Sequence, residues 1–534
     1  MVLSGRLNRT PFNGTRRKLV LAFDVGTTYS GISYSILDPG QEPDIKGVTR
    51  FPANEQISGS SKIPTVIYYD KEGKVRAVGA EAMREGIHET ASDEGWVKAE
   101  WFKLHIRPKS GPPSQASEKI PPLPPGKTVI QVLADFLWYL RTCAEAYIKG
   151  TYPNGRELWD LVEPDIDYVI SHPNGWEGYQ QSQIRKAVVQ ATLIPDTEQG
   201  HSRVSFVTEG EASLHFTIDN GFSAEAMQHG EGIIVVDAGG GTIDISAYRK
   251  RTETNAETKV DLFEEICIPQ CHFHGSVFVS IHAQLYLDEY LKDSDYHEDL
   301  NYIVRCFDKT TKIQFKSDDQ PQYIRFGGNR DNDPTYNIRF GQLRLSGASV
   351  AGFFEPSIKC IVDAVLSMAA NTQKSIKHVA LVGGFSASDW LVSKVDQALS
   401  PSGLRVVHPE NYVNKAVSDG AVSYYLDHRV KTRITKVAYG AMCEAPYRFL
   451  NSEHRQRRST VITCLDGVVR VPGRFLSILP KNTPISEEQK FTPVTLTLLS
   501  ETNTTSTLKE TLWCYKGNDP EPRWKDMDDS ERSY

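Results

Sequence analysis

The stretch at residues 21–35, LAFDVGTTYSGISYS, decides the fold. It places a polar Asp-Val-Gly-Thr-Thr turn between two runs of apolar, β-branched and aromatic residues, a pattern typical of a β-hairpin. Far downstream, residues 232–248 read GIIVVDAGGGTIDISAY, with the same order of apolar strand, Asp-x-Gly turn with threonine, and second strand. One element repeated at this distance predicts two similar lobes rather than a solenoid.

Strand-like and helix-like segments alternate around these two hairpins. Short apolar runs predict strands at residues 167–171, 204–207 and 377–382. Longer runs with helical spacing predict helices at residues 172–193, 209–216, 276–291, 302–315, 350–369 and 389–400. This alternation predicts an α/β fold in which helices cover both faces of a sheet.

Composition excludes several classes of protein. The 534 residues carry 60 Lys and Arg against 67 Asp and Glu, a formal net charge of −7, which argues against a general binder of nucleic acid or anionic membranes. The apolar runs are strand-sized, whereas a membrane helix needs roughly 18–20 residues, so we expect a soluble protein. The eight cysteines are spread along the chain, which favours a reducing intracellular compartment, cytoplasm or nucleus.

Three stretches break the α/β pattern. The basic residues 1–17 lack an apolar core and predict a disordered tail, with a short targeting peptide as the alternative. The Pro-rich residues 111–126 predict an inserted loop, and docking into an aromatic groove of a partner is the alternative. From residue 433 onward the chain is richer in Thr, Val and Arg, and the alternation at residues 494–498 predicts a strand. Residues 517–534 predict a frayed end.

The turns themselves point to phosphate binding. Glycine lets the backbone approach a phosphate closely, and consecutive turn amides form an anion-binding nest. Threonine hydroxyls add donors, and an aspartate can hold Mg²⁺ through water molecules. A third glycine turn, Val382-Gly383-Gly384-Phe385, also follows an apolar strand. Three such turns predict a nucleotide enclosed between two lobes.

These motifs also carry a family resemblance. LAFDVGTTYSGISYS, IIVVDAGGGTIDIS and HVALVGGFSAS resemble the phosphate-1, phosphate-2 and adenosine motifs of the actin-like ATPase superfamily, and within it the 70 kDa heat-shock protein family. KIPTVIYYD with VGAEA, DYVISHPNGW and FVTEGEAS support the resemblance, which extends from residue 19 to residue 427. The chain looks like the divergent heat shock 70 kDa protein 12 type branch.

The resemblance implies a two-lobed actin-like ATPase fold with duplicated ribonuclease-H-like subdomains. Lobe I would span residues 18–230 and lobe II residues 231–430. Residues 431–534 would form a short β-rich C-terminal region.

The resemblance also implies roles for individual residues. Asp24 would face the hydration shell of Mg²⁺, Lys103 would orient the attacking water, and Glu209 would position water and metal. Asp237 would be the second acid at the metal and a candidate base, and Asp244 would contact a monovalent cation such as K⁺. The β- and γ-phosphates of ATP or ADP would be held by Gly26, Thr27, Thr28, Tyr29, Gly239, Gly240, Gly241 and Thr242. Gly383 and Gly384 would lie against the adenosine, with Lys312 and Lys316 as ribose or adenine contacts.

Two departures from the family pattern concern the nucleotide. His274-Gly275-Ser276-Val277 stands where the family has Gly-Gly-Glu-Asp, so two acids near the cleft are lost. Ala387 replaces an arginine that would stack on adenine. We therefore expect weaker or altered nucleotide affinity. The family's interdomain linker and long substrate domain are not recognisable, although residues 474–484 resemble one β-segment of that domain, so the sequence does not predict ATP-driven peptide capture.

Several alternatives stay open from the sequence. The favoured function is slow Mg-ATP hydrolysis that gates lobe closure and couples it to a protein partner or client, without nucleic acid or membrane. The rivals are a nucleotide-holding scaffold with little hydrolysis and a small-molecule kinase of the same superfamily. Cys267, Cys271, His272 and His274 have residue types that zinc prefers, but their compact spacing favours a strand-to-helix turn over a zinc site.

Overall fold

The structure of the chain, a computed structural model, consists of two compact units. Unit 1 comprises Met1–Leu262 and Pro269–Arg429, and unit 2 comprises Phe263–Ile268 and Val430–Tyr534. The structure describes residues 9–53, 61–107, 119–176, 178–220, 227–255, 258–372, 376–408, 413–492, 511–517, 519–526 and 530–532. The predicted boundaries of lobe I, lobe II and the C-terminal region stay a prediction.

The first sheet of unit 1 is built on the N-terminal hairpin. Its order is β3-β2-β1-β8-β9, with β4 pairing β2, and its strands are β1 (Lys18–Val25), β2 (Tyr29–Leu37), β3 (Lys46–Gly47), β4 (Ile63–Pro64), β8 (Asp167–His172) and β9 (Val204–Thr208). β1 and β2 are antiparallel, with Asp24 opposite Gly31. β8 pairs in parallel with both β1 and β9.

Alternate residues of β1 supply two different cores. Leu21 and Phe23 pack in a cluster with residues of α3 (Val129–Thr151) and α5 (Gly178–Gln190). Val20 and Ala22 face the opposite way and pack with residues of α13 (Ala416–Asp427). Because successive side chains of a strand point to opposite faces, a strand buried on both faces reads as the continuous apolar run seen in the sequence.

The second sheet of unit 1 repeats this arrangement. Its order is β18-β17-β10-β11-β12, with β13 pairing β11. Its strands are β10 (Gly232–Ala238), β11 (Ile243–Asn255), β12 (Thr258–Glu265), β13 (Gln270–His272), β17 (Ile376–Val382) and β18 (Arg405–Val407), and the residues of β12 from Phe263 onward belong to unit 2. β10 is antiparallel to β11 and parallel to β17, which in turn is parallel to β18. Both sheets therefore combine a hairpin with two later parallel strands, and the predicted α/β class is confirmed.

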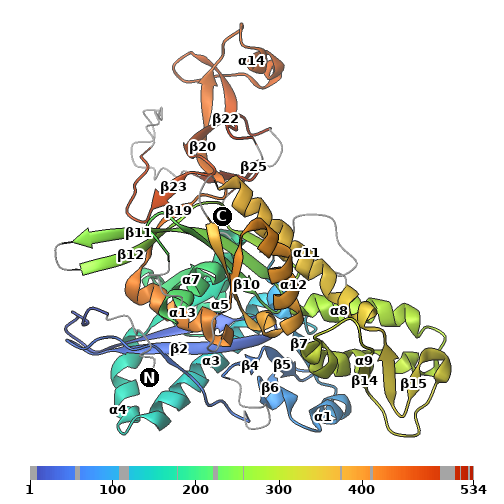
Figure 1. Cartoon of the computed structure of the whole chain (residues 1–534). Coiled ribbons are helices and arrows are strands. Elements are labelled where there is room, and N and C mark those ends of the chain that lie inside the picture. The colour runs from blue at the N-terminus through green and yellow to red at the C-terminus, as the bar shows by residue number, and fades with distance from the viewer. Residues whose placement is uncertain are drawn as a thin grey trace. The chain divides into compact units, whose positions relative to one another are not determined.

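Helices and two small sheets complete unit 1 (Figure 1). The remaining helices are α1 (Ile87–Glu94), α4 (Gly155–Val162), α6 (Glu198–Ser202), α7 (Glu209–Asp219), α8 (Ser276–Tyr290), α9 (Leu300–Cys306), α10 (Lys312–Gln314), α11 (Gly347–Asn371) and α12 (Asp389–Leu399). The small sheets are formed by β5 (Val66–Tyr69), β6 (Val75–Val78) and β7 (Val97–Glu100), and by β14 (Gln322–Arg325), β15 (Ile338–Arg339) and β16 (Gln342–Leu345). The helix predicted at residues 302–315 is interrupted by a π-helical turn at Phe307–Thr311.

The sequence predicts a disordered tail at residues 1–17, and the structure corrects this prediction for residues 9–17. Arg9 bridges two helices, because its guanidinium lies 2.5 Å from Asp219 of α7 and 3.1 Å from Asp427 of α13. The amide of Phe12 also donates to the carbonyl of Gln41 at 2.9 Å. These contacts join residues far apart in sequence, so no local sequence pattern predicts them.

Unit 2 consists mainly of strands. β19 (Val430–Ile434) pairs with Phe263 and Glu264 and with β23 (Pro484–Ser486). A five-stranded sheet has the order β21-β22-β20-β24-β25, and its strands are β20 (Ala438–Pro446), β21 (Ile462–Thr463), β22 (Val469–Leu479), β24 (Leu512–Tyr515) and β25 (Ser530–Arg532). A short helix, α14 (Ser452–Gln456), follows β20.

Part of the stretch predicted to be a frayed end is ordered in the structure. Trp524 is buried, and its indole nitrogen donates to Glu453 at 2.8 Å. The Arg457 guanidinium lies 4.5 Å from the centre of the same ring, and β25 pairs with β24. The strand predicted at residues 494–498 and the first part of the Pro-rich stretch, residues 111–118, lie outside the described residues.

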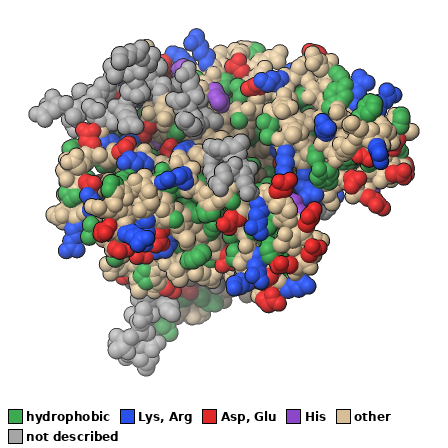
Figure 2. Space-filling view, turned by 90° about the horizontal axis from the view of Figure 1, so that it is seen from below, with side chains coloured by type: hydrophobic (Ala, Val, Ile, Leu, Met, Phe, Trp, Pro, Cys, Tyr) green, Lys and Arg blue, Asp and Glu red, His purple; other side chains and the backbone are tan. Residues whose placement is uncertain are grey.

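Within the described ranges, no helix combines the length and apolar character needed to cross a bilayer. Figure 2 shows Lys and Arg side chains interspersed with Asp and Glu over one face of the chain. Such mixing agrees with the small negative net charge.

The contact between α7 and α13 depends on one glycine. A Cβ atom on Gly420 would lie 1.8 Å from the carbonyl oxygen of Ala212, a backbone atom that cannot move aside alone. We expect Gly420→Ala to lower the free energy of unfolding by about 1–3 kcal/mol through overpacking. Urea denaturation measures this change.

Gly352→Ala is the matched control. Gly352 lies in α11, and a Cβ there would meet no atom within 4 Å. Because alanine favours a helix over glycine by about 1 kcal/mol, this variant should be slightly more stable than the wild type. Equal effects of the two substitutions would contradict the tight contact at Gly420.

Candidate functional site

The turns of the two hairpins meet. A Cβ atom on Gly240 would lie 2.3 Å from the hydroxyl oxygen of Thr28, and one on Gly241 would lie 2.3 Å from that of Thr27. The turn after β10 therefore lies directly against the turn after β1, although more than two hundred residues separate them. Glycine is required at both positions because any side chain would enter the other turn.

The N-terminus of helix α8 supports the second turn through backbone hydrogen bonds. The amides of Gly275, Ser276 and Val277 donate to the carbonyls of Gly241, Gly239 and Gly240, at 3.3, 3.0 and 2.8 Å. The first amides of a helix have no partner within the helix, so they are available for this role. Gly239 also closes its own turn by donating to the carbonyl of Thr242 at 2.9 Å.

Asp24 lies at the end of β1 with both carboxylate oxygens engaged. Lys62 donates to one oxygen at 2.7 Å, and Ser171 donates to the other at 3.2 Å. Lys62 belongs to the KIPTVIYYD stretch and Ser171 to the end of β8. Gly26 is fixed by the same turn, because a Cβ there would lie 2.2 Å from the carbonyl oxygen of Tyr29.

Lys103 and Glu209 form a buried ion pair. The ammonium of Lys103 lies 2.5 Å from Glu209, and 5.6 Å from the centre of the Trp176 ring. Burial opposes the charge of Lys103, but the carboxylates of Glu209 and Asp24 outweigh it and raise the lysine pKa. For Glu209, burial raises the pKa, and the negative charges of Asp244, Asp24 and Asp237 raise it further. The positive charge of Lys103 opposes this increase.

A strained residue precedes Lys103. Trp101 has a φ of 53°, in the left-handed region, and it caps the 3-10 helix Phe102–Ile106 that carries the lysine. That conformation costs an ordinary residue roughly 1–2 kcal/mol. The surrounding fold thus holds Lys103 in a position that the local sequence disfavours.

Asp237 lies at the end of β10 beneath the third turn. Ser213 of α7 donates to one of its oxygens at 2.9 Å. Gly383, with a φ of 88°, approaches the other so closely that a Cβ would lie 2.2 Å away. Burial raises the pKa of Asp237 to about 7, and the charges of Asp244 and Asp24 add to the effect. Gly384 follows on the exposed side of the same turn.

Asp244 is held by a residue that the sequence analysis did not single out. The amide of Asn174 donates to Asp244 at 2.6 Å, and the Asn174 side chain donates to Ser246 at 2.9 Å and accepts from the Gly210 amide at 3.2 Å. Burial raises the pKa of Asp244. Asn174 follows an apolar strand in a Pro-Asn-Gly turn, the same signal that marks the other turns, and this signal could have found it.

The remaining predicted contacts lie near the edge of this cluster. The ammonium of Lys312 lies beside Asp308 and 3.2 Å from the hydroxyl of Ser280. Tyr29 is 47% exposed, and burial together with the charge of Asp308 raises its pKa. Lys316 pairs with Asp389 at 2.7 Å just beyond the Gly383 turn, and both side chains are mostly exposed.

The donor set suits a divalent cation bound largely through water. The cluster contains four buried carboxylates, those of Asp24, Glu209, Asp237 and Asp244. Lys62 pairs with Asp24, and Lys103 pairs with Glu209. Across the described residues, no group of three or more His, Cys, Asp or Glu side chains could hold a metal ion by itself. Mg²⁺ commonly takes one or two carboxylates and completes its shell with water and phosphate oxygens, which this arrangement fits.

The strand-to-helix turn predicted within Cys267–His274 is present in the structure. Cys271 packs against Gly175, and burial together with the charge of Asp244 raises its thiol pKa well above its usual value. His272 interacts with the Gln270 side chain at 2.9 Å. The segment forms β13 and the turn into α8.

Comparison with known proteins supports the resemblance seen in the sequence. Heat shock 70 kDa protein 12A from Mus musculus is 23% identical over 502 residues, covering 79% of this chain and 71% of that protein. The Homo sapiens 12A protein is 22% identical over the same coverage, and Homo sapiens heat shock 70 kDa protein 12B is 23% identical over 511 residues. The chain is similar to the heat shock 70 kDa 12 proteins. No family model matches it.

This similarity confirms the predicted divergent branch of the heat-shock 70 resemblance. The similarity extends over 79% of the chain. The roles assigned to the individual residues stay predictions.

The Lys103–Glu209 pair allows a test of the cluster's electrostatics. Lys103→Met leaves a buried carboxylate without its counter-charge, and we expect the free energy of unfolding to fall by about 3–5 kcal/mol. The double variant Lys103→Met with Glu209→Gln should recover much of this loss, because neither charge then remains buried. Urea denaturation of the four proteins gives the coupling. A double variant as unstable as the sum of the single variants would contradict the pairing.

The raised pKa of Asp237 predicts a pH dependence. An unfolded aspartate titrates near pH 3.9, whereas folding raises the pKa of Asp237 to about 7. Between these values the native state binds more protons, so Asp237 makes the free energy of unfolding fall as pH rises. Asp237→Asn cannot ionise, so its stability relative to the wild type should rise between pH 5 and pH 7.

Urea denaturation at the two pH values measures this difference. Asp396→Asn, an exposed carboxylate on α12, is the control and should show little change. A difference between Asp237→Asn and the wild type that stays constant with pH, or falls, would show that Asp237 is ionised throughout this range.

Proposed function

We propose that the chain binds Mg-ATP and hydrolyses it slowly, in the manner of heat-shock-70-type ATPases. The observation that carries this proposal is the direct contact between the Thr27-Thr28 turn and the Gly240-Gly241 turn beside four buried carboxylates. Glycine turns suit phosphate oxygens, and an excess of buried acid suits a metal cation. Phosphoryl transfer to water depends mainly on positioning and charge neutralisation, which these groups can supply.

The residues divide this work by their positions. Bound Mg²⁺ would supply positive charge to the phosphates, with Asp24 and Asp237 as the carboxylates that face it. The turn amides and the hydroxyls of Thr27 and Thr28 would orient the phosphates. Lys103 and Glu209 would position the attacking water, and Asp237 would accept its proton.

The fold belongs to the same proposal. We infer two actin-like lobes, each built on one of the two sheets with the order hairpin plus two parallel strands. α7 runs from β9 of the first sheet to the segment before β10 of the second, and α13 packs across it. These two helices would act as the hinge when nucleotide closes the lobes, and closure would couple to a protein partner or client.

A second candidate is a nucleotide-holding scaffold with little hydrolysis. It is favoured by the ion pair between Lys62 and Asp24, which already neutralises a carboxylate that would face the metal. In this case nucleotide would order the lobes without being consumed.

Calorimetric titration with ADP and ATP plus Mg²⁺, with phosphate release followed on the same sample, tests both candidates. We expect binding with slow turnover in the wild type. Asp237→Asn should keep binding and lose about a hundredfold in turnover, the usual contribution of a general base. Asp396→Asn should match the wild type in both measurements.

Gly240→Val gives a second test that does not depend on turnover. The valine side chain would enter the space of Thr28, so nucleotide binding should be lost. Binding without turnover in the wild type would select the scaffold. No binding of either nucleotide by a folded wild-type protein would overturn both candidates.

A further inference from the structure

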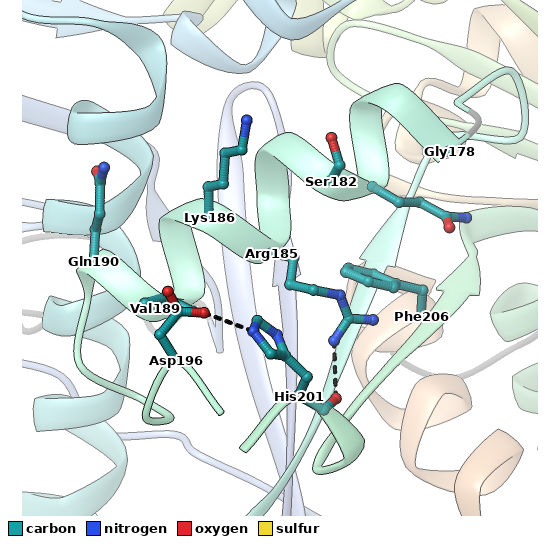
Figure 3. Close-up of a pocket in the computed structure, with 10 residues that line it drawn as sticks. Gly178, Ser182, Arg185, Lys186, Val189, Gln190, Asp196, His201 and Phe206 are labelled. Atoms are coloured by element: carbon teal, nitrogen blue, oxygen red, sulfur yellow. Dashed lines mark hydrogen bonds and ion pairs between the residues drawn. The ribbon is translucent and has the colours of Figure 1, made fainter. Parts of the chain in front are cut away.

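A cavity of about 640 Å³ lies on α5 and shares no residue with the turns described above (Figure 3). Its walls come from α5, from the segment around α6 and from Phe206 of β9. Small-molecule sites commonly enclose 300–1,000 Å³ and combine apolar walls with a few polar groups. The size of this cavity is within that range.

Arg185 is the central polar group of the cavity. Its guanidinium stacks over the Phe206 ring at 4.9 Å and donates one hydrogen bond, at 2.9 Å, to the carbonyl of His201. Figure 3 shows the guanidinium turned toward this carbonyl with the ring beside it. The side chain is therefore fixed in one orientation by its neighbours, which lowers the entropy cost of binding a ligand.

The charge of Arg185 has no acidic partner among the described residues. Asp196, the acid that lines the cavity, pairs instead with His201 at 2.8 Å. Burial lowers the pKa of Arg185, and no carboxylate opposes this effect. A partly desolvated guanidinium without a counter-ion is a position where an anion gains more than at an exposed arginine.

Other side chains fit the same ligand. Gln181 and Ser182 line the cavity one helical turn before Arg185, and Lys186 places a second cation at its exposed rim. Val189 and the Phe206 ring also line the cavity and add apolar surface. Two cations beside an aromatic wall favour a ligand that has both an anionic group and an apolar part.

We propose that this cavity binds a small ligand that joins a carboxylate or phosphate group to a flat apolar moiety, with Arg185 holding the anionic group. The guanidinium can form parallel hydrogen bonds to two oxygens of either group. The apolar part would lie against Val189 and Phe206.

The proposal is tested by calorimetric titration of the full chain, without nucleotide, with phenyl phosphate and with benzoate. Benzyl alcohol, which keeps the ring but lacks the charge, is the neutral control. We expect at least one of the two anions to bind at least tenfold more tightly than the alcohol. Binding of phenyl phosphate alone assigns a phosphate ligand, and binding of benzoate alone assigns a carboxylate.

Variants of Arg185 complete the test. Arg185→Gln should weaken the binding of the anion at least tenfold. Arg185→Lys keeps a cation near Phe206 but loses the planar fork, so it should bind with intermediate affinity and serves if the glutamine variant does not fold. Arg305→Gln, at an exposed arginine over Tyr302 of α9, should leave binding unchanged. Equal binding of the alcohol, no binding of either anion, or full affinity in Arg185→Gln would overturn the proposal.

Discussion

The close approach of the Thr27-Thr28 turn to the Gly240-Gly241 turn is the constraint on which the rest of unit 1 depends. Each turn sits where an apolar strand ends and its hairpin partner begins, so the two sheets must be oriented to bring those strand ends together. The amides of α8 hold the second turn from behind. The close approach of the two turns requires the N-terminus of α8 at this position. It also requires glycines, which leave no side chain between the turns.

That approach has an electrostatic cost, because it gathers buried acids. Asp24 and Asp237 end the two central strands, and Glu209 and Asp244 lie on adjoining elements. Two lysines offset part of this charge. Burial, together with the negative charge that remains, raises the pKa of Asp237. A fold selected for stability alone would gain from apolar residues at these positions. Under the proposed function, a bound cation would offset the charge of these acids.

The sequence predicts this centre well because its signals are local. The strand, Asp-x-Gly turn and strand pattern predicts both hairpins, and the strand before Gly383 predicts the third turn. The same reasoning applied to Pro173-Asn174-Gly175 would have identified Asn174, which bonds to Asp244 and to Gly210. Lys62 had no such signal. It directly precedes β4, which pairs with β2 next to Asp24, and its stretch shows no turn at the lysine.

The sequence fails where a contact is purely long-range. Residues 9–17 look like a basic tail, but Arg9 becomes ordered because two acids from distant helices, Asp219 and Asp427, converge on it. Trp524 sits in a charged, Pro-containing stretch, yet its ring is buried against Arg457 and Arg474. In both cases the partner that orders the residue comes from elsewhere in the chain. Composition therefore predicts whether such a segment is ordered in isolation. Tertiary contacts determine whether it is ordered in the folded chain.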